Sequence, residues 1–70
     1  MNTDYAHAEG FATFTGDVKR AFEISKWCKE RNLVHEVDYK YHCGRTDTTH
    51  IIIFQFKDPK QATIARLVWT

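Results

Sequence analysis

The alternation of hydrophobic and polar residues near the start of the chain predicts a strand followed by a helix. The segment from Phe11 to Thr15 is rich in β-favouring residues and precedes Gly16, which predicts a short strand ending in a turn. Asp17 has the chemistry of an N-cap, and apolar residues at spacings of three and four predict a helix to about Arg31. The expected inward face of this helix comprises Val18, Ala21, Phe22, Ser25 and Cys28, with Ile24 and Trp27 on its flank.

The middle of the chain predicts two long strands joined by a hairpin. The segment from Leu33 to Cys43 alternates with period two. Its apolar face carries Leu33, Val37, Tyr39 and Tyr41, and its polar face carries Glu36, Asp38, Lys40 and His42. Residues 44–47 have the composition of a hairpin connection. Residues 49–57 return as a strand that is apolar on both faces, with Ile52, Phe54 and Phe56 on one and Ile51 and Ile53 on the other.

The last segment opens with a strong signal for the start of a helix. Asp58 is the predicted N-cap, Pro59 takes the first helical position and Gln61 takes the capping-box position. Ala62 and Ala65 are small enough to let this helix pack closely on a sheet. Residues 66–70 either continue the helix or form a last short strand, and we favour the strand.

This order of elements predicts a ferredoxin-like α+β domain, βαββα(β), with an antiparallel sheet and two helices on one face. We expect residues 1–9 to be a flexible tail and residues 10–70 to form the single domain. In that topology the first and third strands are central and the second is an edge strand. The alternating charges of Glu36, Asp38 and Lys40 suit an edge, because they discourage pairing with other chains.

The composition narrows the functional classes. Seventy residues allow one domain, and a hydrophobic fraction of 43% is enough for a core. Ten basic and nine acidic residues give a net charge of +1, which argues against a nucleic-acid binder. Two cysteines are too few for a disulfide framework, which favours a cytoplasmic protein with free thiols. Neither a signal peptide nor a membrane span is predicted.

The sequence raises two hypotheses of site chemistry: a bound metal ion and a nucleophilic cysteine. His42, Cys43 and His50 lie on the two sides of the hairpin, and Cys28 or His35 would add a fourth zinc ligand. However, the chain has no paired ligand spacing of the CxxC type. Cys43 with His50 or His35 would make a nucleophile and base, but so small a domain offers little room for a pocket. We therefore predict no catalytic residue, no metal and no cofactor, and expect the protein not to be an enzyme.

The open face of the predicted sheet is the favoured binding surface. If the aromatic residues of the third strand face the helices, Ile51 and Ile53 face the other way together with Gln55. Glu36, Asp38, Lys40 and His42 would surround them on the neighbouring strand. An apolar centre with a charged rim is typical of a protein-contact surface, either for a partner or for a homodimer. The alternative is that Ile51 and Ile53 are simply exposed aliphatic side chains or lie under the N-terminal tail.

One segment resembles a nucleic-acid-binding family. The stretch HIIIFQFKDPKQATIARL is similar to the third strand and second helix of an RNA-recognition motif. That family stacks bases on aromatic side chains of the open sheet face. Ile51 and Ile53 take the stacking positions here, and an aliphatic side chain does not stack as an aromatic ring does. Phe11 or Phe14 would supply one aromatic ring from the first strand, so single-stranded nucleic-acid binding is the second hypothesis.

The C-terminal half also resembles small accessory proteins of tailed bacteriophages. The similarity lies in an apolar strand ending in Phe-x-Phe, a short acidic turn, an Ala-containing helix and a terminal Trp. The residues that carry it are Phe54, Phe56, Asp58, Ala62, Leu67 and Trp69. The segment WCKERN, around Trp27, shows a weaker similarity to the same group. The resemblance implies a modulator or inhibitor that acts in the bacterial cytoplasm on a host or defence protein.

Overall fold

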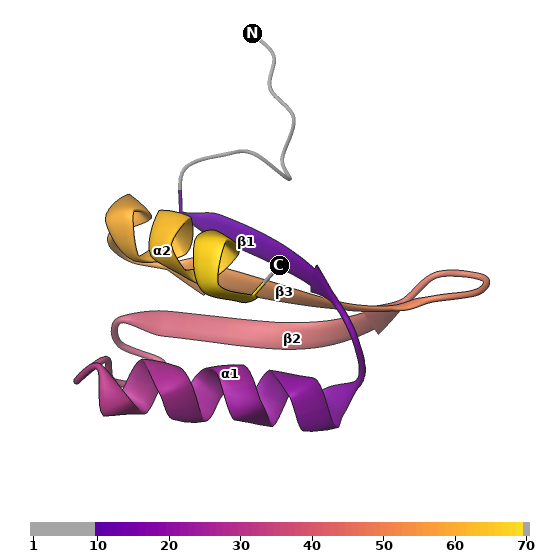
Figure 1. Cartoon of the computed structure of the whole chain (residues 1–70), viewed down its shortest axis with the longest axis horizontal. Helices are drawn as coiled ribbons and strands as arrows, with labels where there is room; N and C mark the ends of the chain where they lie inside the picture. Colours follow the sequence, from indigo (N-terminus) through magenta and orange to yellow (C-terminus); the bar gives the residue numbers. More distant parts are fainter. Residues whose placement is uncertain (1–9, 70) are drawn as a thin grey trace, which may run out of the picture.

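In the computed structural model, which describes residues 10–69, three strands and two helices follow one another along the chain (Figure 1). These are β1 (Phe11–Thr15), α1 (Val18–Glu30), β2 (Tyr39–Arg45), β3 (His50–Phe56) and α2 (Pro59–Trp69). The protein is therefore a small α+β fold, as predicted. The predicted tail of residues 1–9 and the last residue, Thr70, lie outside the described residues.

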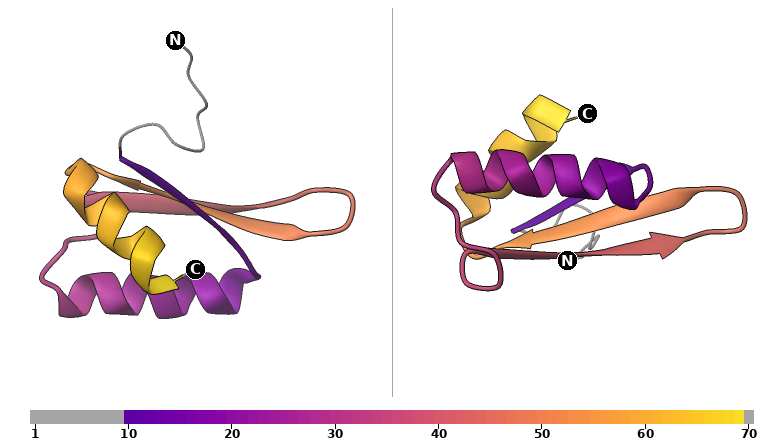
Figure 2. Two further views of the ribbon diagram at one scale, coloured as in Figure 1. Left: turned by 45° about the horizontal axis from the view of Figure 1, so that its top comes forward. Right: turned by 90° about the horizontal axis from the view of Figure 1, so that it is seen from below.

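The strands form one antiparallel sheet in the order β1-β3-β2, with β3 in the centre. Both helices lie on the same face of the sheet, which gives the described chain two layers (Figure 2). This strand order is compatible with the predicted ferredoxin-like arrangement. With β3 between them, β1 and β2 run parallel to each other, and α1 connects them across the sheet.

The core lies between the sheet and the two helices. β3 contributes its even-numbered residues, Ile52, Phe54 and Phe56, all of which are buried as the alternation predicted. Phe54 stacks on Tyr41 with ring centroids 4.7 Å apart, and Phe14 meets it edge-on at 6.1 Å. The helices close the core mainly with small residues, which lets their backbones approach the sheet. These helix residues are Ala21, Ile24, Ser25, Cys28, Ala62 and Ala65.

α1 begins and ends where its capping residues place it. The Asp17 carboxylate accepts a hydrogen bond from the Arg20 N–H at 3.3 Å, which satisfies one free amide of the first turn. At the other end, the Leu33 N–H donates to the Cys28 carbonyl and the Asn32 N–H to the Lys29 carbonyl. Asn32 adopts a left-handed conformation with φ of 68°, which completes a Schellman motif.

The inward face of α1 is rotated relative to the prediction. Val18 and Phe22 were expected in the core but are 53% and 61% exposed. Ile24, which we placed on the flank, is fully buried instead. The reason is that α1 covers only the β2 side of the sheet, so one flank of the helix faces α2 and the other extends past the edge of β2 (Figure 1).

α2 continues through Trp69, so the predicted last strand is wrong for the described residues. Tertiary contacts hold its final turn: Arg20 donates a hydrogen bond to the Trp69 carbonyl, and the Trp69 ring meets Trp27 edge-on at 6.2 Å. Asp58 caps the start, accepting from the Lys60 N–H at 3.0 Å. The Gln61 side chain does not complete a capping box, because its oxygen accepts a hydrogen bond from Arg31 across the helices.

Without a fourth strand in the described chain, β1 lies at an edge of the sheet rather than in the centre. Its outward carbonyl at Phe11 accepts a hydrogen bond from the Arg66 guanidinium of α2. Within residues 10–69, β1 is therefore an edge strand and not the predicted central one, whereas the central place of β3 and the edge place of β2 are compatible with the prediction.

The second strand is shorter than predicted, because residues 33–38 form a turn. Glu36 has φ of 72°, a left-handed conformation incompatible with a regular strand. The Asp38 carboxylate accepts a hydrogen bond from the Val34 N–H at 2.7 Å, and this bond closes the turn. Glu36 and Asp38 therefore do not alternate with Lys40 and His42 on one strand face, as we had expected.

Candidate functional site

The face of the sheet opposite the helices forms a grid of nine residues, three from each strand. We call it the open face. Strand register places Phe11, Gln55 and Lys40 in one row, Thr13, Ile53 and His42 in the next, and Thr15, Ile51 and Gly44 in the third. No helix or strand among residues 10–69 covers this face (Figure 2).

Ile51 and Ile53 form the apolar centre of the open face. Both are only half-buried, whereas their neighbour Ile52 on the other face is fully buried. The Ile51 side chain lies over Gly44, where an added Cβ would be 3.5 Å from its Cγ1. Gly44 therefore leaves one side of Ile51 open, and a side chain from another molecule has room to contact it.

Phe11 extends the apolar centre toward the other end of β3. Its ring is half-buried on the open face, while Phe14 of the same strand is buried in the core. This answers the choice left open by the sequence between Phe11 and Phe14 as the aromatic residue of this surface. Sequence reasoning did not include Phe11, Thr13 or Thr15 in the favoured binding surface. The strict alternation of FATFT carried the signal, because every second residue of a strand lies on one face.

A shallow hollow of about 310 Å³ lies at the Phe11 end of the open face. Its lining residues are Phe11, Glu36, Lys40, Tyr41, His42, Ile53 and Gln55. Enclosed ligand sites usually measure about 300–1,000 Å³, so this hollow is at the lower limit. It suits a single side chain of a partner better than a complete small molecule.

The structure brings together six of the seven residues predicted for the binding surface. Ile51, Ile53 and Gln55 lie on β3, and Lys40 and His42 lie beside them on β2. Glu36 reaches the same surface from the preceding turn, since it lines the hollow. Asp38 lies at the margin of this surface: it lines a neighbouring hollow with Glu36, Lys40 and Gln55, and its carboxylate closes that turn.

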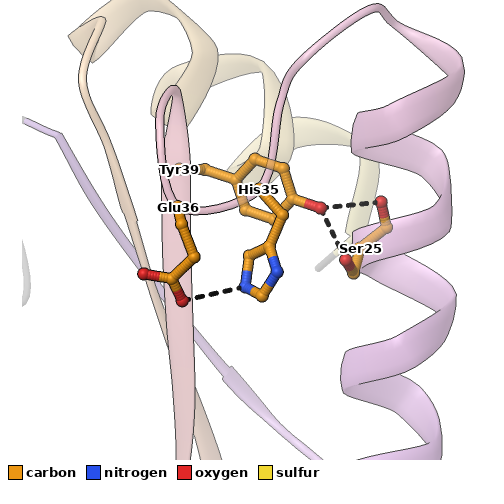
Figure 3. A network of polar contacts seen from close by, with 4 residues as sticks. All are labelled: Ser25, His35, Glu36 and Tyr39. Atoms are coloured by element: carbon orange, nitrogen blue, oxygen red, sulfur yellow. Dashed lines mark hydrogen bonds and ion pairs between the residues drawn. The ribbon is translucent and has the colours of Figure 1, made fainter.

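A polar network next to this surface connects the turn to α1 (Figure 3). The Tyr39 hydroxyl lies 2.6 Å from the Ser25 hydroxyl and donates to the Ser25 carbonyl at 3.3 Å. The His35 ring lies between Tyr39 and Tyr41, with centroids 5.2 Å from each, and its Nε2 is 3.4 Å from the Glu36 carboxylate. Burial raises the pKa of Tyr39 above its ordinary value, so this hydroxyl stays protonated at neutral pH. Glu36, whose side chain is 71% exposed, meets this network only through His35.

The two cysteines differ in their surroundings. Burial raises the pKa of Cys28 to about 11, so this thiol is protonated at neutral pH and is poorly suited to act as a nucleophile. Cys43 is exposed on β2. Within residues 10–69, no three His, Cys, Asp or Glu side chains are close enough to hold a metal ion. In the same range, no helix is long and apolar enough to cross a membrane.

No protein-family model matches the chain, and neither a curated protein nor a solved structure matches it.

Proposed function

We propose that this protein is a non-enzymatic binding module that contacts a partner protein through the open face. The observation that supports the proposal is the pair of half-buried isoleucines at the centre of an uncovered sheet in the described chain. Burying them fully contributes up to about 1.5–3 kcal/mol for each side chain relative to full exposure, which a partner gains on docking. Polar and charged residues surround this centre, as in the rim of a protein interface. They are Thr13, Thr15, Lys40, His42, Gln55 and, from the turn, Glu36.

The resemblance to phage accessory proteins suggests the kind of partner. We propose a host or defence protein in the bacterial cytoplasm, whose activity the bound module modulates or inhibits. We also propose that the domain is a ferredoxin-like unit whose described residues end with α2 and include no fourth strand.

Single-stranded nucleic acid is the alternative ligand, and Phe11 is the observation that favours it. Its ring lies in one row with Gln55 and Lys40, so one base could stack on Phe11 while the Lys40 ammonium contacts a phosphate. The aliphatic centre and the net charge of +1 argue against this ligand.

Replacing Ile51 and Ile53 together with lysine separates the two hypotheses. A charged pair at the centre of a protein interface removes partner binding, whereas two added lysines strengthen binding to an oligonucleotide. The measurements are affinity capture from a bacterial lysate and titration with a labelled single-stranded oligonucleotide at two salt concentrations. We expect I51K/I53K to stay folded, because both side chains lie outside the core, and to lose proteins that the wild type captures.

A matched control replaces two exposed apolar residues of α2, which are far from the open face. Leu67 and Val68 are 77% and 54% exposed, so L67K/V68K adds the same charge to a different surface. This variant is expected to capture the same proteins as the wild type. If both double variants capture what the wild type captures, the open face is not the binding surface. Oligonucleotide binding that rises in I51K/I53K and weakens at high salt would support the alternative.

A further inference from the structure

An exposed apolar flank of α1 remains outside the proposed site. Val18 and Phe22, one helical turn apart, are 53% and 61% exposed. The opposite flank of α1 faces α2, since Trp27 meets Trp69 there and Arg20 binds the Trp69 carbonyl. Val18 and Phe22 therefore lie on the flank of α1 that is turned away from α2.

This flank runs along β2 in the opposite direction to the strand. Near one end the Ser25 hydroxyl meets the Tyr39 hydroxyl, and near the other Val18 lines a groove together with Cys43. Phe22 is between Ser25 and Val18 on the helix, so it lies at the level of Tyr41. Four helix residues advance about 6 Å and two strand residues about 6.6 Å, so the helix and strand stay in step over this length.

The backbone of β2 is open to pairing at the same level. The Asp38 carbonyl accepts from the Lys57 N–H, so alternation directs the peptide groups of Tyr39, Tyr41 and Cys43 to the outer edge. The Tyr39 carbonyl already accepts a hydrogen bond from the Glu36 N–H at 2.7 Å. For the backbone groups of Tyr41 and Cys43, residues 10–69 supply no hydrogen-bond partner. An unpaired strand edge of this kind is a template for another strand.

We propose that this side of the molecule binds a second copy of the same chain. The edge pair of Tyr41 and Cys43 and the flank pair of Val18 and Phe22 have a common midpoint. A two-fold axis through that midpoint places each Tyr41 opposite the second copy's Cys43. The same rotation places each Val18 against the second copy's Phe22. This single rotation therefore pairs the free backbone groups of β2 with those of the second copy and buries Val18 and Phe22, as an isologous interface requires.

Charge and size agree with this occupant. The net charge of +1 produces little repulsion between copies. The side that carries α1 and β2 spans the longest and shortest dimensions of the molecule, 35 Å and 21 Å (Figure 1). Standard interfaces bury about 800 Å² on each partner, which is the scale of this side. The dimer has one continuous six-stranded antiparallel sheet.

The opposite edge of the sheet is partly occupied by a side chain of α2. At β1 the Arg66 guanidinium binds the outward Phe11 carbonyl, so a charged group occupies the edge at that point. The outer apolar residues of α2, Leu67 and Val68, follow Arg66 toward the end of the helix. This difference favours β2 over β1 as the dimer edge.

Substituting Val18 and Phe22 with residues of opposite charge tests the proposed dimer and the pairing of these two residues across the two-fold axis. Sedimentation velocity over a range of concentrations is expected to show a dimer for the wild type. V18E and F22K are each expected to weaken dimerisation about tenfold or more, because each brings a charge into the apolar contact. In V18E/F22K the introduced carboxylate of each copy faces the introduced ammonium of the other, so dimerisation is expected to return. The control L67K/V68K should dimerise like the wild type.

The contact is independent of the proposed function, so I51K/I53K should also remain dimeric. Hydrogen exchange of the wild type supplies a measurement that needs no variant: the Tyr41 and Cys43 amides should exchange more slowly as concentration rises. A wild type that is monomeric at several hundred micromolar would overturn the proposal. So would a dimer that persists in both V18E and F22K, or failure of V18E/F22K to restore it while its circular dichroism shows a folded chain.

Discussion

The two faces of β3 have similar composition but different surroundings. Ile52, Phe54 and Phe56 are buried beneath α1 and α2, while Ile51 and Ile53, one residue away, are half-buried on a face that no described element covers. An aliphatic strand is thus not sufficient to create a core, because burial also needs a second layer. The helices supply that layer with small residues such as Ala21, Ala62 and Ala65, which allow close packing on one side only.

Alanine substitutions at adjacent isoleucines test this difference directly. We expect Ile52→Ala to lower the free energy of unfolding by about 2–5 kcal/mol, because it leaves a cavity in the core. Ile53→Ala should cost less than about half as much, since its side chain is already partly in contact with water. Urea denaturation followed by far-UV circular dichroism measures both. Equal losses would mean that a second layer also covers Ile53 in solution.

Hydroxyl removal distinguishes two stacked tyrosines on the covered face. Tyr39→Phe is expected to lower the free energy of unfolding by about 1 kcal/mol, because it breaks the buried contact with Ser25. Tyr41→Phe is the matched control. Its hydroxyl has no hydrogen-bond partner within residues 10–69, so a change below about 0.5 kcal/mol is expected. If the two variants lose the same stability, the Ser25 contact contributes nothing measurable.

The two cysteines show where the cover over the sheet ends. Cys43 lies on the same face of β2 as Tyr39 but is exposed near the hairpin, whereas Cys28 is buried in the core. Iodoacetamide at pH 8 is therefore expected to modify one thiol in the folded monomer, Cys43, and both in urea. Peptide mass spectrometry identifies the modified residue. Rapid labelling of Cys28 without urea would mean that α1 does not stay packed on the sheet.

Alkaline pH gives the smallest expected change. The pKa of Cys28 is about 11 in the folded protein against an ordinary value of 9.0, so the fold favours the protonated thiol. The stability due to this preference is complete below pH 9 and is lost as the pH rises through 11. Between pH 8 and 9.5 we expect a loss below about 1 kcal/mol. Cys28→Ala should lack this part of the pH dependence, and an identical pH dependence in both proteins would contradict the assignment.

Local signals predicted most of the secondary structure. Asp17 and Asp58 cap the helices as their positions suggested, and the alternation from Ile51 to Phe56 identified which residues face the core. These features depend on neighbours in the sequence, so a single sequence contains them. The central place of β3 in the described sheet also agrees with its two apolar faces, which suit a central strand and which an edge strand avoids.

The structural predictions were wrong where contacts between distant parts of the chain determine the conformation. The left-handed conformation of Glu36 depends on hydrogen bonds from the turn to Tyr39 and Asp38, and nothing in a glutamate predicts it. The helical end of α2 depends on Arg20, 49 residues away. The exposure of Val18 and Phe22 follows from the position of α1 at one side of the sheet. Helical periodicity identified an apolar side of α1 but not how far the sheet extends beneath it.

Trp27 and Trp69, the two tryptophans of the chain, make the edge-on contact between α1 and α2. All indole emission therefore originates at the junction of the helices, on the far side of the core from the open face. Fluorescence should report separation of α1 from α2 before the sheet itself is lost. A ligand that quenches this emission without changing the far-UV circular dichroism would be acting on the helical layer and not on the isoleucines of β3.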